Sequence, residues 1–579
     1  MPRIVRRDAQ ENHPKKLSGH LPPLLQRIYA ARDVSDMAQL DHELTQLLPY
    51  HDLLNIELAT HYLVEMLQQQ LRVLIIGDFD ADGATSAALL VSVLRSFGLQ
   101  HVHYLVPNRF EYGYGLTPEI VLVAKERNPD WIITVDNGIS SHDGIAKAHE
   151  LGMKVLVTDH HLPGDTLPPA EVIINPNQPG CQFASKALAG VGVAFYLLLA
   201  LRARLRELDW FHENTIAEPN LAHALDLVAL GTVADVVPLD HNNRILVHQG
   251  LKRMRLGRMR AGIRALLEAS GRSVHQLVAT DLGFGVGPRL NAAGRLDDMS
   301  LGIECLLTED HDHARHIAEQ LSLLNEERKQ IGDDMQLQAM QIVQALHLGE
   351  GKDLPAGLCL YDRSWHQGVI GILASRIKEA YHRPVIAFAH NEGTVLKGSA
   401  RSVKGVNIRD VLDLVDKHCP GVLISFGGHA MAAGLSLDEK DLAAFSAAFA
   451  VEIGKCLTVD DLQGVYYSDG ELALDEYTLD MATQLREGGP WGQAFPEPSF
   501  DGEFNVLNQR IVGAKHLKLQ LGFPGSHRVL DAIYFNINTD QWPNRRAERV
   551  RAVYRLDVNE YQSKRNVQLM IEYLEAITD

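Results

Sequence analysis

Residues Leu71–Gly83 read LRVLIIGDFDADG, and this stretch decides the fold. Its apolar part, Val73–Ile76, is short and rich in β-branched residues, which predicts a buried strand of a parallel sheet. Ala84–Phe97 has the composition of a helix, and three acids precede it at alternate positions: Asp78, Asp80 and Asp82. Three carboxylates within five residues repel one another unless a cation lies among them, so the stretch predicts a metal site at the end of a strand. A solvated acidic turn that caps the helix is the simpler alternative.

Strands and helices alternate outward from this stretch. The predicted strands cover 72–77, 102–106, 131–135, 154–158 and 171–174, and the predicted helices cover 84–97, 117–127 and 142–151. Such alternation is typical of a parallel sheet with helices on both faces. In an open sheet of this kind the ligand crevice lies at the carboxyl ends of the strands. Polar residues that directly follow the strands are therefore candidates for a functional site.

Acids and histidines follow the other strands as well. In WIITVDNG, Asp136 follows the third strand, and in KVLVTDHH, Asp159, His160 and His161 follow the fourth. A further acid, Asp235 in GTVADVVP, lies in a predicted loop after a helix, and nothing local forces it into the crevice. A lone His–His pair is more often structural, but unrelated strands need not all end in metal-compatible residues. We therefore expect Asp136, His160 and His161 to converge with the three acids of DFDADG, with Asp235 as a further candidate to complete the cluster.

The types of ligand indicate the ions. Many carboxylates with few nitrogen ligands favour Mn²⁺ or Mg²⁺. Six or seven ligands exceed what one such ion needs, because Mg²⁺ usually keeps several waters. Two ions about 3.5–4 Å apart, bridged by one carboxylate and one water, fit the pattern better, and such pairs hydrolyse phosphate esters.

The rest of the chain adds further domains. Residues 309–347 predict a long helix that connects two of them. Residues 356–455 predict a second α/β unit, with strands at 358–362, 384–389 and 394–400, helices at 368–381 and 409–416, and a glycine-rich stretch at 426–434. From about residue 460, short alternating segments predict a small β barrel or sandwich: Phe504–Leu507, Lys515–Leu521, Ala532–Asn536 and Arg551–Val558. The predicted fold class is a multidomain α/β protein with a parallel sheet, a connecting helix, a second α/β domain and a C-terminal β barrel.

The composition indicates the cellular compartment of the protein. The five cysteines are scattered without a CxxC pair, which argues against a disulfide scaffold or zinc ribbon and fits a reducing compartment. The N-terminal arginines precede a polar stretch, so we expect no signal peptide. The longest apolar run, Val191–Leu201, is too short to span a bilayer. We therefore expect a cytoplasmic protein without a membrane segment.

The net charge of −18 does not favour nucleic-acid binding. Two acid-free stretches nevertheless stand out. Arg244–Arg264 holds seven basic residues, and Asn505–Leu530 holds four: Arg510, Lys515, Lys518 and Arg528. Charge runs are most often solvated faces; in an acidic chain we also interpret these two as localised anion-binding surfaces.

The motifs DFDADG, VDNG and TDHH, in this order and spacing, resemble those of the DHH phosphoesterase superfamily. WHQGVIGILASR, GSARS and FGGHAMAAG resemble its DHHA1 companion domain. With PRLNAAGR and a β domain that resembles an OB-fold, the chain from about residue 50 onward is similar to single-strand-specific 5′→3′ DNA exonucleases of that superfamily. The resemblance implies an N-terminal extension (1–50), a DHH domain (51–300), a connecting helix (301–350), a DHHA1 domain (351–458) and an OB-like nucleic-acid-binding domain (459–579).

The resemblance also implies roles for the site residues. One metal ion would be held by Asp80 and Asp136, with Asp78 as a further candidate ligand. The second ion would be held by Asp82, Asp136, His160 and Asp235, so that Asp136 bridges the two. His161 would contact the scissile phosphate or stabilise the leaving oxygen, and Asp159 would orient a ligand.

Candidate substrate residues lie outside these motifs. Ser399 and Arg401 in GSARS combine a hydroxyl and a guanidinium, which together make a phosphate clamp, although such a pair alone is more often a surface feature. By resemblance they would hold the 5′-terminal phosphate with an arginine of PRLNAAGR, where Arg295 is the first candidate and Arg289 the second. His429 lies in the glycine-rich stretch, which either contacts substrate or forms a tight packing turn.

Aromatic residues are candidates for base stacking. Tyr114 and Tyr112, in NRFEYGYG, would stack on bases, or they pack within their loop. Trp365 and His366 would touch nucleotides, with core packing as the alternative for the tryptophan.

The resemblance implies a processive 5′→3′ single-strand DNA exonuclease that releases 5′-mononucleotides in recombination and repair. A DHH–DHHA1 hydrolase of short RNA oligomers or cyclic dinucleotides is one alternative, but it needs only the two α/β units, whereas this chain continues well beyond Gly464. A non-catalytic replication scaffold of the same fold is another, but such relatives lose metal ligands that are all present here. The implied partners are single-stranded DNA, a helicase and a single-strand binding protein, and we expect a monomer.

Overall fold

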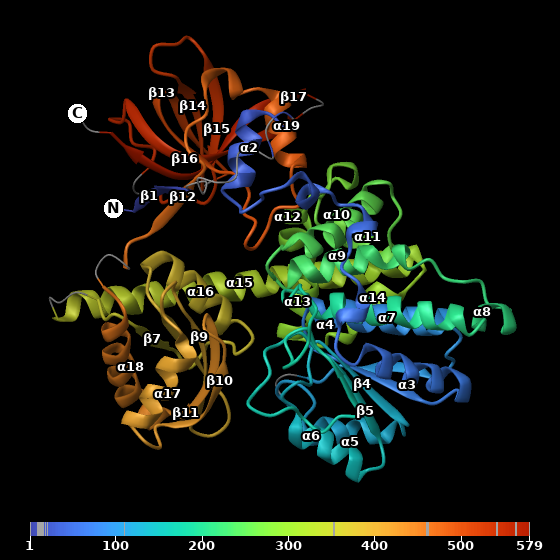
Figure 1. Cartoon of the computed structure of the whole chain (residues 1–579). Helices are drawn as coiled ribbons and strands as arrows, with labels where there is room; N and C mark the ends of the chain where they lie inside the picture. Colours follow the sequence, from blue (N-terminus) through green and yellow to red (C-terminus); the bar gives the residue numbers. More distant parts are fainter. Residues whose placement is uncertain are drawn as a thin grey trace. The chain divides into compact units, whose positions relative to one another are not determined.

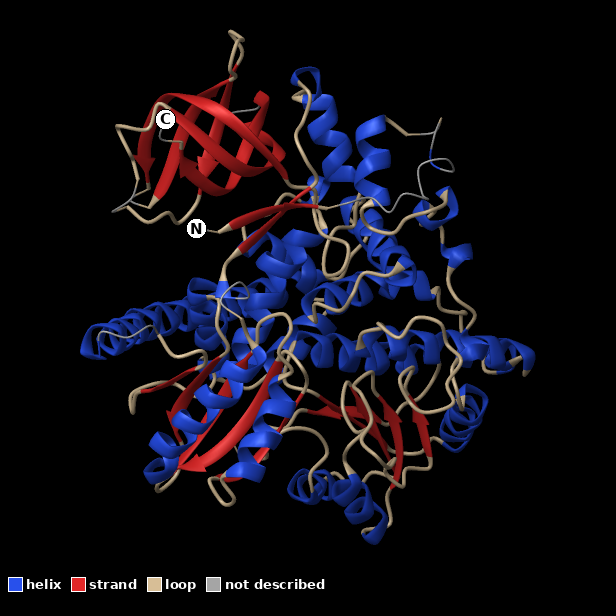
Figure 2. Ribbon diagram, turned by 60° about the vertical axis from the view of Figure 1, so that its left-hand side comes forward, coloured by secondary structure: helices blue, strands red, loops and turns tan. Residues whose placement is uncertain are grey.

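The structure is a computed structural model that describes residues 2–7, 17, 19, 21–108, 111–350, 354–458, 462–513, 515–539, 542–561 and 564–577. The chain divides into two compact units (Figures 1 and 2). The smaller unit comprises residues 1–3 and 323–466, and the larger unit comprises residues 4–322 and 467–579.

The larger unit contains the predicted parallel sheet. Its strands follow the order β3-β2-β4-β5-β6, and every neighbouring pair is parallel. Their bounds are Val73–Gly77 (β2), Val102–Leu105 (β3), Trp131–Val135 (β4), Lys154–Thr158 (β5) and Val172–Ile174 (β6). In Figure 1, one face is covered by α5 (Pro118–Glu126) and α6 (His142–Glu150), and the other by α3 (Ile56–Gln69), α4 (Ala81–Ser96) and α7 (Gly190–Glu207). Because both faces are covered, the strands read as continuous apolar runs.

Helix α4 begins at Ala81 rather than at Ala84, where the sequence pattern placed its start. The carboxylate of Asp80 is the reason, because its Oδ1 accepts hydrogen bonds from the backbone N–H groups of Asp82 (2.9 Å) and Gly83 (3.0 Å). This is an N-cap, which satisfies amides that a helix start leaves without partners. Asp82 therefore lies inside the first turn of the helix and is completely buried.

A layer of helices follows the sheet in sequence. It contains α8 (Trp210–Glu213), α9 (Leu225–Ala234), α10 (His241–Arg255), α11 (Ala261–Ala269), α12 (Ala279–Asp281), the π-helical turn η6 (Leu282–Val286), α13 (Gly287–Leu296) and α14 (Ser300–Leu307). Several arginines of the first basic run donate to carbonyl oxygens here: Arg244 to Leu239, Arg255 to Leu277 and Arg264 to Gly257. These side chains tie the helical layer together, so much of this run is not an open anion-binding surface.

The C-terminal part of the larger unit is a closed barrel of five strands in the order β13-β14-β15-β17-β16. The strands are Phe500–Val512 (β13), His516–Gly522 (β14), Val529–Tyr534 (β15), Arg549–Tyr561 (β16) and Lys564–Ala576 (β17). β15 and β17 are parallel and the other pairs are antiparallel. This order is that of an OB-fold, which confirms the predicted barrel. Helix α19 (Leu479–Glu487) packs against β16.

The N-terminal segment joins this barrel region to the helical layer. After β1 (Arg3–Arg6), which pairs with β12 (Val465–Ser468), helix α2 spans Pro23–Ala30. Arg32 then makes two hydrogen bonds to the carboxylate of Asp469, at 2.8 and 3.0 Å, and both side chains are at most 1% exposed. Arg7 also reaches this carboxylate, at 3.1 Å. No role for residues 1–50 is predicted from the sequence, and the structure shows that part of them anchors the segment that leads into the barrel.

The smaller unit is the second predicted α/β domain. Its sheet has the order β10-β11-β9-β8-β7, with strands Leu358–Tyr361 (β7), Val385–His390 (β8), Val395–Arg401 (β9), Leu423–Gly428 (β10) and Ala432–Asp438 (β11). Its helices are α16 (Ile370–Tyr381), α17 (Ile408–His418) and α18 (Leu442–Cys456). The glycine-rich stretch forms the β10–β11 hairpin. The long helix α15 (His311–Glu350) begins in the larger unit and continues in the smaller one.

Two further expectations concern individual residues. Trp365 is buried, and its Nε1 donates to Oε1 of Gln338 at 2.8 Å, so the core-packing alternative holds for this tryptophan. All five cysteines are free thiols. Within the described parts of the chain, no helix is both long enough and apolar enough to cross a membrane.

The buried Arg32–Asp469 pair generates a stability prediction. Asp469→Ala leaves the buried Arg32 guanidinium without its carboxylate, so we expect a loss of about 3–5 kcal/mol in the free energy of unfolding. Urea denaturation followed by tryptophan fluorescence measures it. The matched control is Glu503→Ala, which removes a half-exposed partner of Arg549 and should change the free energy by less than about 1 kcal/mol. Equal effects of the two substitutions would contradict the prediction.

Candidate metal centre

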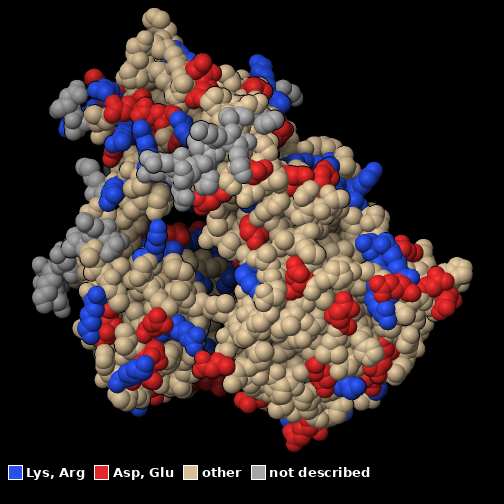
Figure 3. All heavy atoms as spheres, in the orientation of Figure 1, with Lys and Arg blue, Asp and Glu red and all other residues tan. Residues whose placement is uncertain are grey.

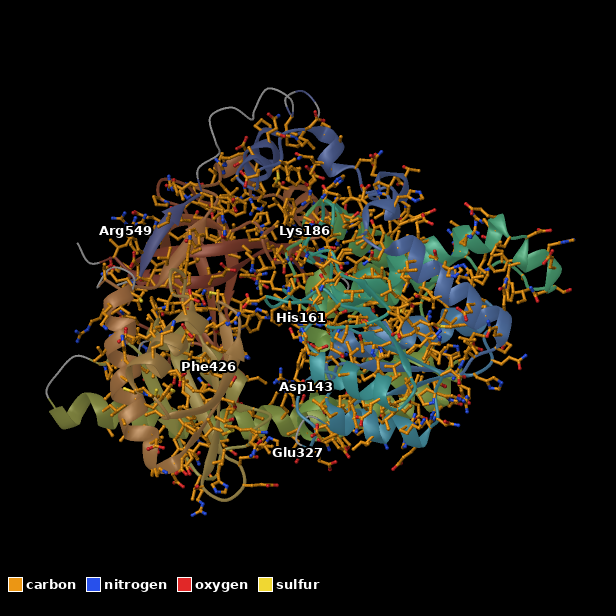
Figure 4. The ribbon with its side chains drawn as sticks, turned by 60° about the horizontal axis from the view of Figure 1, so that its bottom comes forward. Asp143, His161, Lys186, Glu327, Phe426 and Arg549 are labelled. Carbon is orange, nitrogen blue, oxygen red and sulfur yellow. The ribbon has the colours of Figure 1, made fainter. Side chains whose placement is uncertain are left out.

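Seven acidic and histidine side chains meet at the carboxyl edge of the parallel sheet, where Figure 4 labels His161. They form three overlapping groups, and within each group the ligand atoms lie within 4.8 Å of one another. The groups are Asp78, Asp80 and Asp136; Asp136, His160 and His161; and Asp82, His160 and Asp235. The structure thus brings together all the residues that the sequence analysis placed in the crevice, including Asp235.

Asp136 and Asp235 have the geometry of metal ligands. Nε2 of His160 lies 3.0 Å from Oδ1 of Asp136 and 3.4 Å from Oδ2 of Asp235. Among the described residues, neither of these buried carboxylate oxygens accepts a hydrogen bond. Ligands about 2.1 Å from one ion at right angles are about 3 Å apart. The spacing and chemistry of these donors therefore fit a hard divalent cation.

The backbone at Asp136 is left-handed, with φ of +61°. Asp and Asn tolerate this conformation better than most residues with a side chain. The turn directs the Asp136 carboxylate back over the end of β4, towards the groups that follow β2 and β5.

The N-terminus of α7 holds the most buried acid of the cluster. Oδ2 of Asp82 accepts the N–H of Gly190 at 2.6 Å, and its Oδ1 accepts the N–H of Val191 at 2.9 Å. Amides at a helix start favour negative charge. Burial nevertheless raises the pKa of Asp82, and the charges of Asp235 and Asp80 raise it further.

Burial and neighbouring negative charges also raise the pKa values of the other acids. Burial is the main cause that raises the pKa of Asp136 well above its ordinary value, and the charge of Asp82 raises it further. Burial and then the charge of Asp80 raise the pKa of Asp235 to about 7. A cation among these carboxylates would remove the repulsion, so the electrostatics also favour a metal site.

Asp159 holds the second histidine. Its Oδ1 lies 2.7 Å from Nδ1 of His161 and accepts the backbone N–H groups of His160 and His161, while its Oδ2 accepts the N–H of Ile139. Burial alone would raise the pKa of Asp159, but the hydrogen bond and charge of His161 lower it. Burial alone would lower the pKa of His161, but Asp159 raises it to about 9. His161 is therefore an oriented cationic donor beside the acids.

Two glycines allow helices to reach the cluster. A Cβ atom at Gly190 would lie 2.7 Å from Cβ of Asp136, and one at Gly231 would lie 2.9 Å from Oδ1 of Asp82. Real Cβ atoms do not approach so closely, so only glycine lets α7 and α9 pack here. Neither glycine is among the residues predicted from the sequence. The available signal was a glycine inside an apolar helical segment.

Helix α13 supports the DFDADG loop from the other side. Oδ1 of Asn291 accepts the N–H of Ala81 at 2.7 Å, and a Cβ atom at Gly294 would lie 1.8 Å from the carbonyl oxygen of Phe79. The sequence analysis selected the arginines of PRLNAAGR, whereas the asparagine and the glycine of this motif contact the loop. Arg289 donates to Oγ of Ser322 and to the carbonyl oxygens of Gly285 and Ala269, and Arg295 lies in the last turn of the helix.

The two tyrosines of NRFEYGYG have different surroundings. The hydroxyl of Tyr114 lies 3.3 Å from the carbonyl oxygen of Asp136 and 3.3 Å from Nδ1 of His161, and its ring meets Phe79 edge-on. Tyr114 therefore presents its hydroxyl to the cluster. Tyr112 packs against the core of the sheet.

The remaining candidates lie in the smaller unit. Nη1 of Arg401 donates to Oγ of Ser399 at 3.1 Å, and both residues are on one face of β9. A Cβ atom at Gly371, in the first turn of α16, would lie 2.9 Å from Nη2 of Arg401 and 3.0 Å from Oγ of Ser399. A hydroxyl, a guanidinium and a helix start thus adjoin, which are three features of phosphate sites. His429 is exposed in the turn between β10 and β11, and His366 accepts the N–H of Gly368 through Nδ1.

Comparisons with known protein families identify three domains in the chain, one for each of the two five-stranded sheets and one for the barrel. The DHH family N-terminal domain matches residues 72–232, the DHHA1 domain matches residues 355–455, and the RecJ OB domain matches residues 468–573. The fold and the domain order are thus those of a DHH phosphoesterase, a class of metal-dependent hydrolases.

The similarity to individual proteins is closer. The chain is 56% identical to the single-stranded-DNA-specific exonuclease RecJ of Dickeya dadantii over 96% of this chain and 97% of that one. RecJ of Thermus thermophilus in complex with Mn²⁺ has a TM-score of 0.80 at 29% identity, covering 100% of this chain and 80% of that one. The same RecJ in complex with Mg²⁺ has a TM-score of 0.75 at 27% identity, with 100% and 78% covered. This chain belongs to the RecJ family, which confirms the resemblance seen in its motifs.

The cluster generates a metal-binding prediction. Asp136→Asn keeps a residue that tolerates the left-handed backbone but removes the charge at the centre of the cluster. Loss of a residue that only orients a ligand lowers metal affinity by about 10–100-fold, so we expect at least a tenfold loss of Mn²⁺ affinity in calorimetric titration. Asp143→Asn, an exposed acid at the start of α6, is the matched control and should bind as the unchanged protein does. Unchanged binding by Asp136→Asn would exclude it as a ligand.

Proposed function

We propose that this protein is a single-strand-specific 5′→3′ DNA exonuclease that uses two divalent ions, Mn²⁺ or Mg²⁺, and releases 5′-mononucleotides. One observation carries the proposal: seven ligand-competent side chains from four distant segments form one buried cluster. Membership of the RecJ family supports the nuclease activity and the single-stranded substrate. The proposed setting is recombination and repair in the cytoplasm, with a helicase and a single-strand binding protein as partners.

The cluster suggests a role for each side chain. Asp78, Asp80 and Asp136 would hold one ion, and Asp82, Asp136, His160 and Asp235 the other. When bound, the ions lower the pKa of the attacking water and neutralise charge on the phosphate oxygens. His161, kept cationic by Asp159, would donate a hydrogen bond to the phosphate or to the leaving oxygen.

The anion-binding features of the smaller unit suggest the origin of polarity. Arg401, Ser399 and the start of α16 would bind a terminal phosphate. A 5′-phosphorylated strand carries such a group at one end only, so its recognition makes one end the preferred substrate. Arg295, which lies in the larger unit, stays a separate candidate for binding a terminal phosphate.

The barrel suggests how longer strands are bound. Arg510 on β13 pairs directly with Lys518 on β14 in the antiparallel register. Like charges directly opposite each other destabilise a sheet unless an anion lies between them. Lys518 also forms an ion pair with Asp531, Nζ to Oδ2 at 3.7 Å, as Arg549 does with Glu503, and Figure 3 shows both charges interspersed on the barrel. Arg510, with Lys518 beside it, is the proposed phosphate contact of the barrel.

The two alternative functions make different predictions. A hydrolase of short RNA oligomers or cyclic dinucleotides would show no dependence on strand length, whereas a replication scaffold would not hydrolyse phosphodiesters. The decisive experiment digests end-labelled single strands of DNA and RNA with Mn²⁺ and with Mg²⁺. We expect mononucleotides released from the 5′ end of DNA; release from the 3′ end, or the absence of hydrolysis, would refute the proposal.

The terminal-phosphate site generates a kinetic prediction. We expect removal of the 5′-phosphate to raise KM, and Arg401→Gln to abolish most of this difference while leaving kcat within about twofold, because charge-assisted hydrogen bonds to the phosphate are lost. Initial rates on matched 5′-phosphate and 5′-hydroxyl strands measure it. Arg409→Gln makes the same charge change at an exposed position of α17 and should leave the difference intact. A 5′-phosphate effect that persists in Arg401→Gln would exclude this site.

The barrel pair generates a prediction about salt dependence. Replacing both Arg510 and Lys518 with glutamine should weaken binding of long single strands and reduce the slope of log affinity against log salt by about 0.7 for each lost phosphate contact. Fluorescence anisotropy in EDTA, which prevents cleavage, measures the slope. Lys147→Gln on α6 is the control: it removes one positive charge outside the barrel, the same change as at each of the two barrel positions. An unchanged slope would show that the barrel pair does not contact phosphates.

A further inference from the structure

A cavity of about 300 Å³ lies beside the end of α9. None of the described residues that line it is charged. Its walls are mainly apolar and include Val236, Leu239, Phe284 and Trp491. Thr280 and Gln493 add a hydroxyl and an amide group. A site of this size and composition is typical of small organic ligands.

The walls of the cavity are fixed by close packing. A Cβ atom at Gly492 would lie 2.7 Å from Leu239 Cδ1, and the N–H of Leu239 donates to the carbonyl oxygen of Gln493 at 2.8 Å. A Cβ atom at Gly283 would lie 3.3 Å from Val233. The loop before the barrel and the π-helical turn η6 are thus both held against α9 and the segment that follows it, so the cavity is preformed.

Two of its apolar side chains are unusually exposed. Phe284, in η6, is 75% exposed, and Val236 is 63% exposed with a left-handed φ of +61°. A π-helical turn within a helix frequently marks a functional site, and a β-branched residue with positive φ is a true outlier. Strain of this kind persists where function requires it.

The cavity and the candidate metal centre share the end of α9. Val236 directly follows Asp235, and Thr232, another lining residue, directly follows Gly231, which packs against Asp82. The end of α9 therefore contributes to the charged cluster and to the uncharged cavity. A substrate bound at both would need an anionic part for the cluster and a mainly apolar part for the cavity.

We propose that this cavity binds an unpaired nucleobase of the strand whose phosphate lies at the metal centre, with Phe284 stacking on the base. This inference rests on the proposed exonuclease function. A nucleotide has the required combination of phosphate and base, and the uncharged lining excludes the phosphate itself. Thr280 and Gln493 offer hydrogen-bonding groups for the edge of the base. Because bases in a duplex are already stacked and paired, such a site also favours single strands.

Phe284→Ala tests the proposal. Base–aromatic stacking contributes enough that we expect KM for single-stranded DNA to rise roughly 5- to 150-fold. Mn²⁺ affinity in calorimetric titration should stay within about twofold because the cluster is intact. Phe284→Tyr retains the ring and should behave as the unchanged protein does. Leu256→Ala removes an equally exposed apolar side chain outside the cavity and should also have no effect.

A binding measurement gives a second, independent readout. Strands with 2-aminopurine at one position from the 5′ end, bound in EDTA, should show quenching at a particular position, and Phe284→Ala should remove it. An abasic nucleotide at that position should raise KM for the unchanged protein and have no further effect in Phe284→Ala.

The outcomes separate the two proposals. If the unchanged protein does not degrade single-stranded DNA, the proposed function fails, whatever the quenching shows. If it does degrade DNA but Phe284→Ala has normal KM and normal quenching, the cavity holds something other than a base, such as a protein segment, and the inference is overturned.

Discussion

The structure depends on the repulsion among carboxylates that lie close together with too little positive charge among them to balance it. Burial and mutual repulsion raise the pKa values of Asp82, Asp136 and Asp235, so folding this cluster without a cation is costly. The protein offsets part of the cost with oriented donors, since the amides at the start of α7 bind Asp82 and the cationic ring of His161 lies against Asp159. The remaining negative charge is what selects a divalent cation.

Close approach of helices is the second consequence of this constraint. To surround the acids at the strand end, the backbones of α7, α9 and α13 must come into direct contact with the cluster or with its loop. Each helix makes this contact through a glycine: Gly190, Gly231 and Gly294. A Cβ atom at any of these positions would meet the cluster or its loop at under 3 Å. The helical layer thus acts as a rigid support, and the arginines that bond to its carbonyl oxygens contribute to that rigidity.

The sequence predicted the parts of the site that follow from local rules. The parallel sheet brings the ends of β2, β4 and β5 together, so Asp78, Asp136 and His160 could be assigned to one crevice from strand pattern alone. The support around them depends on packing between distant segments, which no local pattern reports. The contact of Asn291 with Ala81 spans 210 positions. The first basic run was similarly ambiguous, because a guanidinium that bonds to a carbonyl and one that faces solvent have the same local sequence.

The end of α9 links the two halves of the proposed substrate site. Asp235 is at the cap of this helix, and its N–H still donates to the carbonyl oxygen of Gly231, which fixes the carboxylate relative to the helix axis. The left-handed backbone at Val236 then turns the chain sharply, so the valine side chain lines the cavity instead of continuing the helix. A displacement of α9 would therefore move a candidate metal ligand and a wall of the proposed base site together. Because the phosphate and base of one nucleotide are covalently linked, such coupling would keep the two sites at a constant separation, which a nuclease that advances one nucleotide at a time requires.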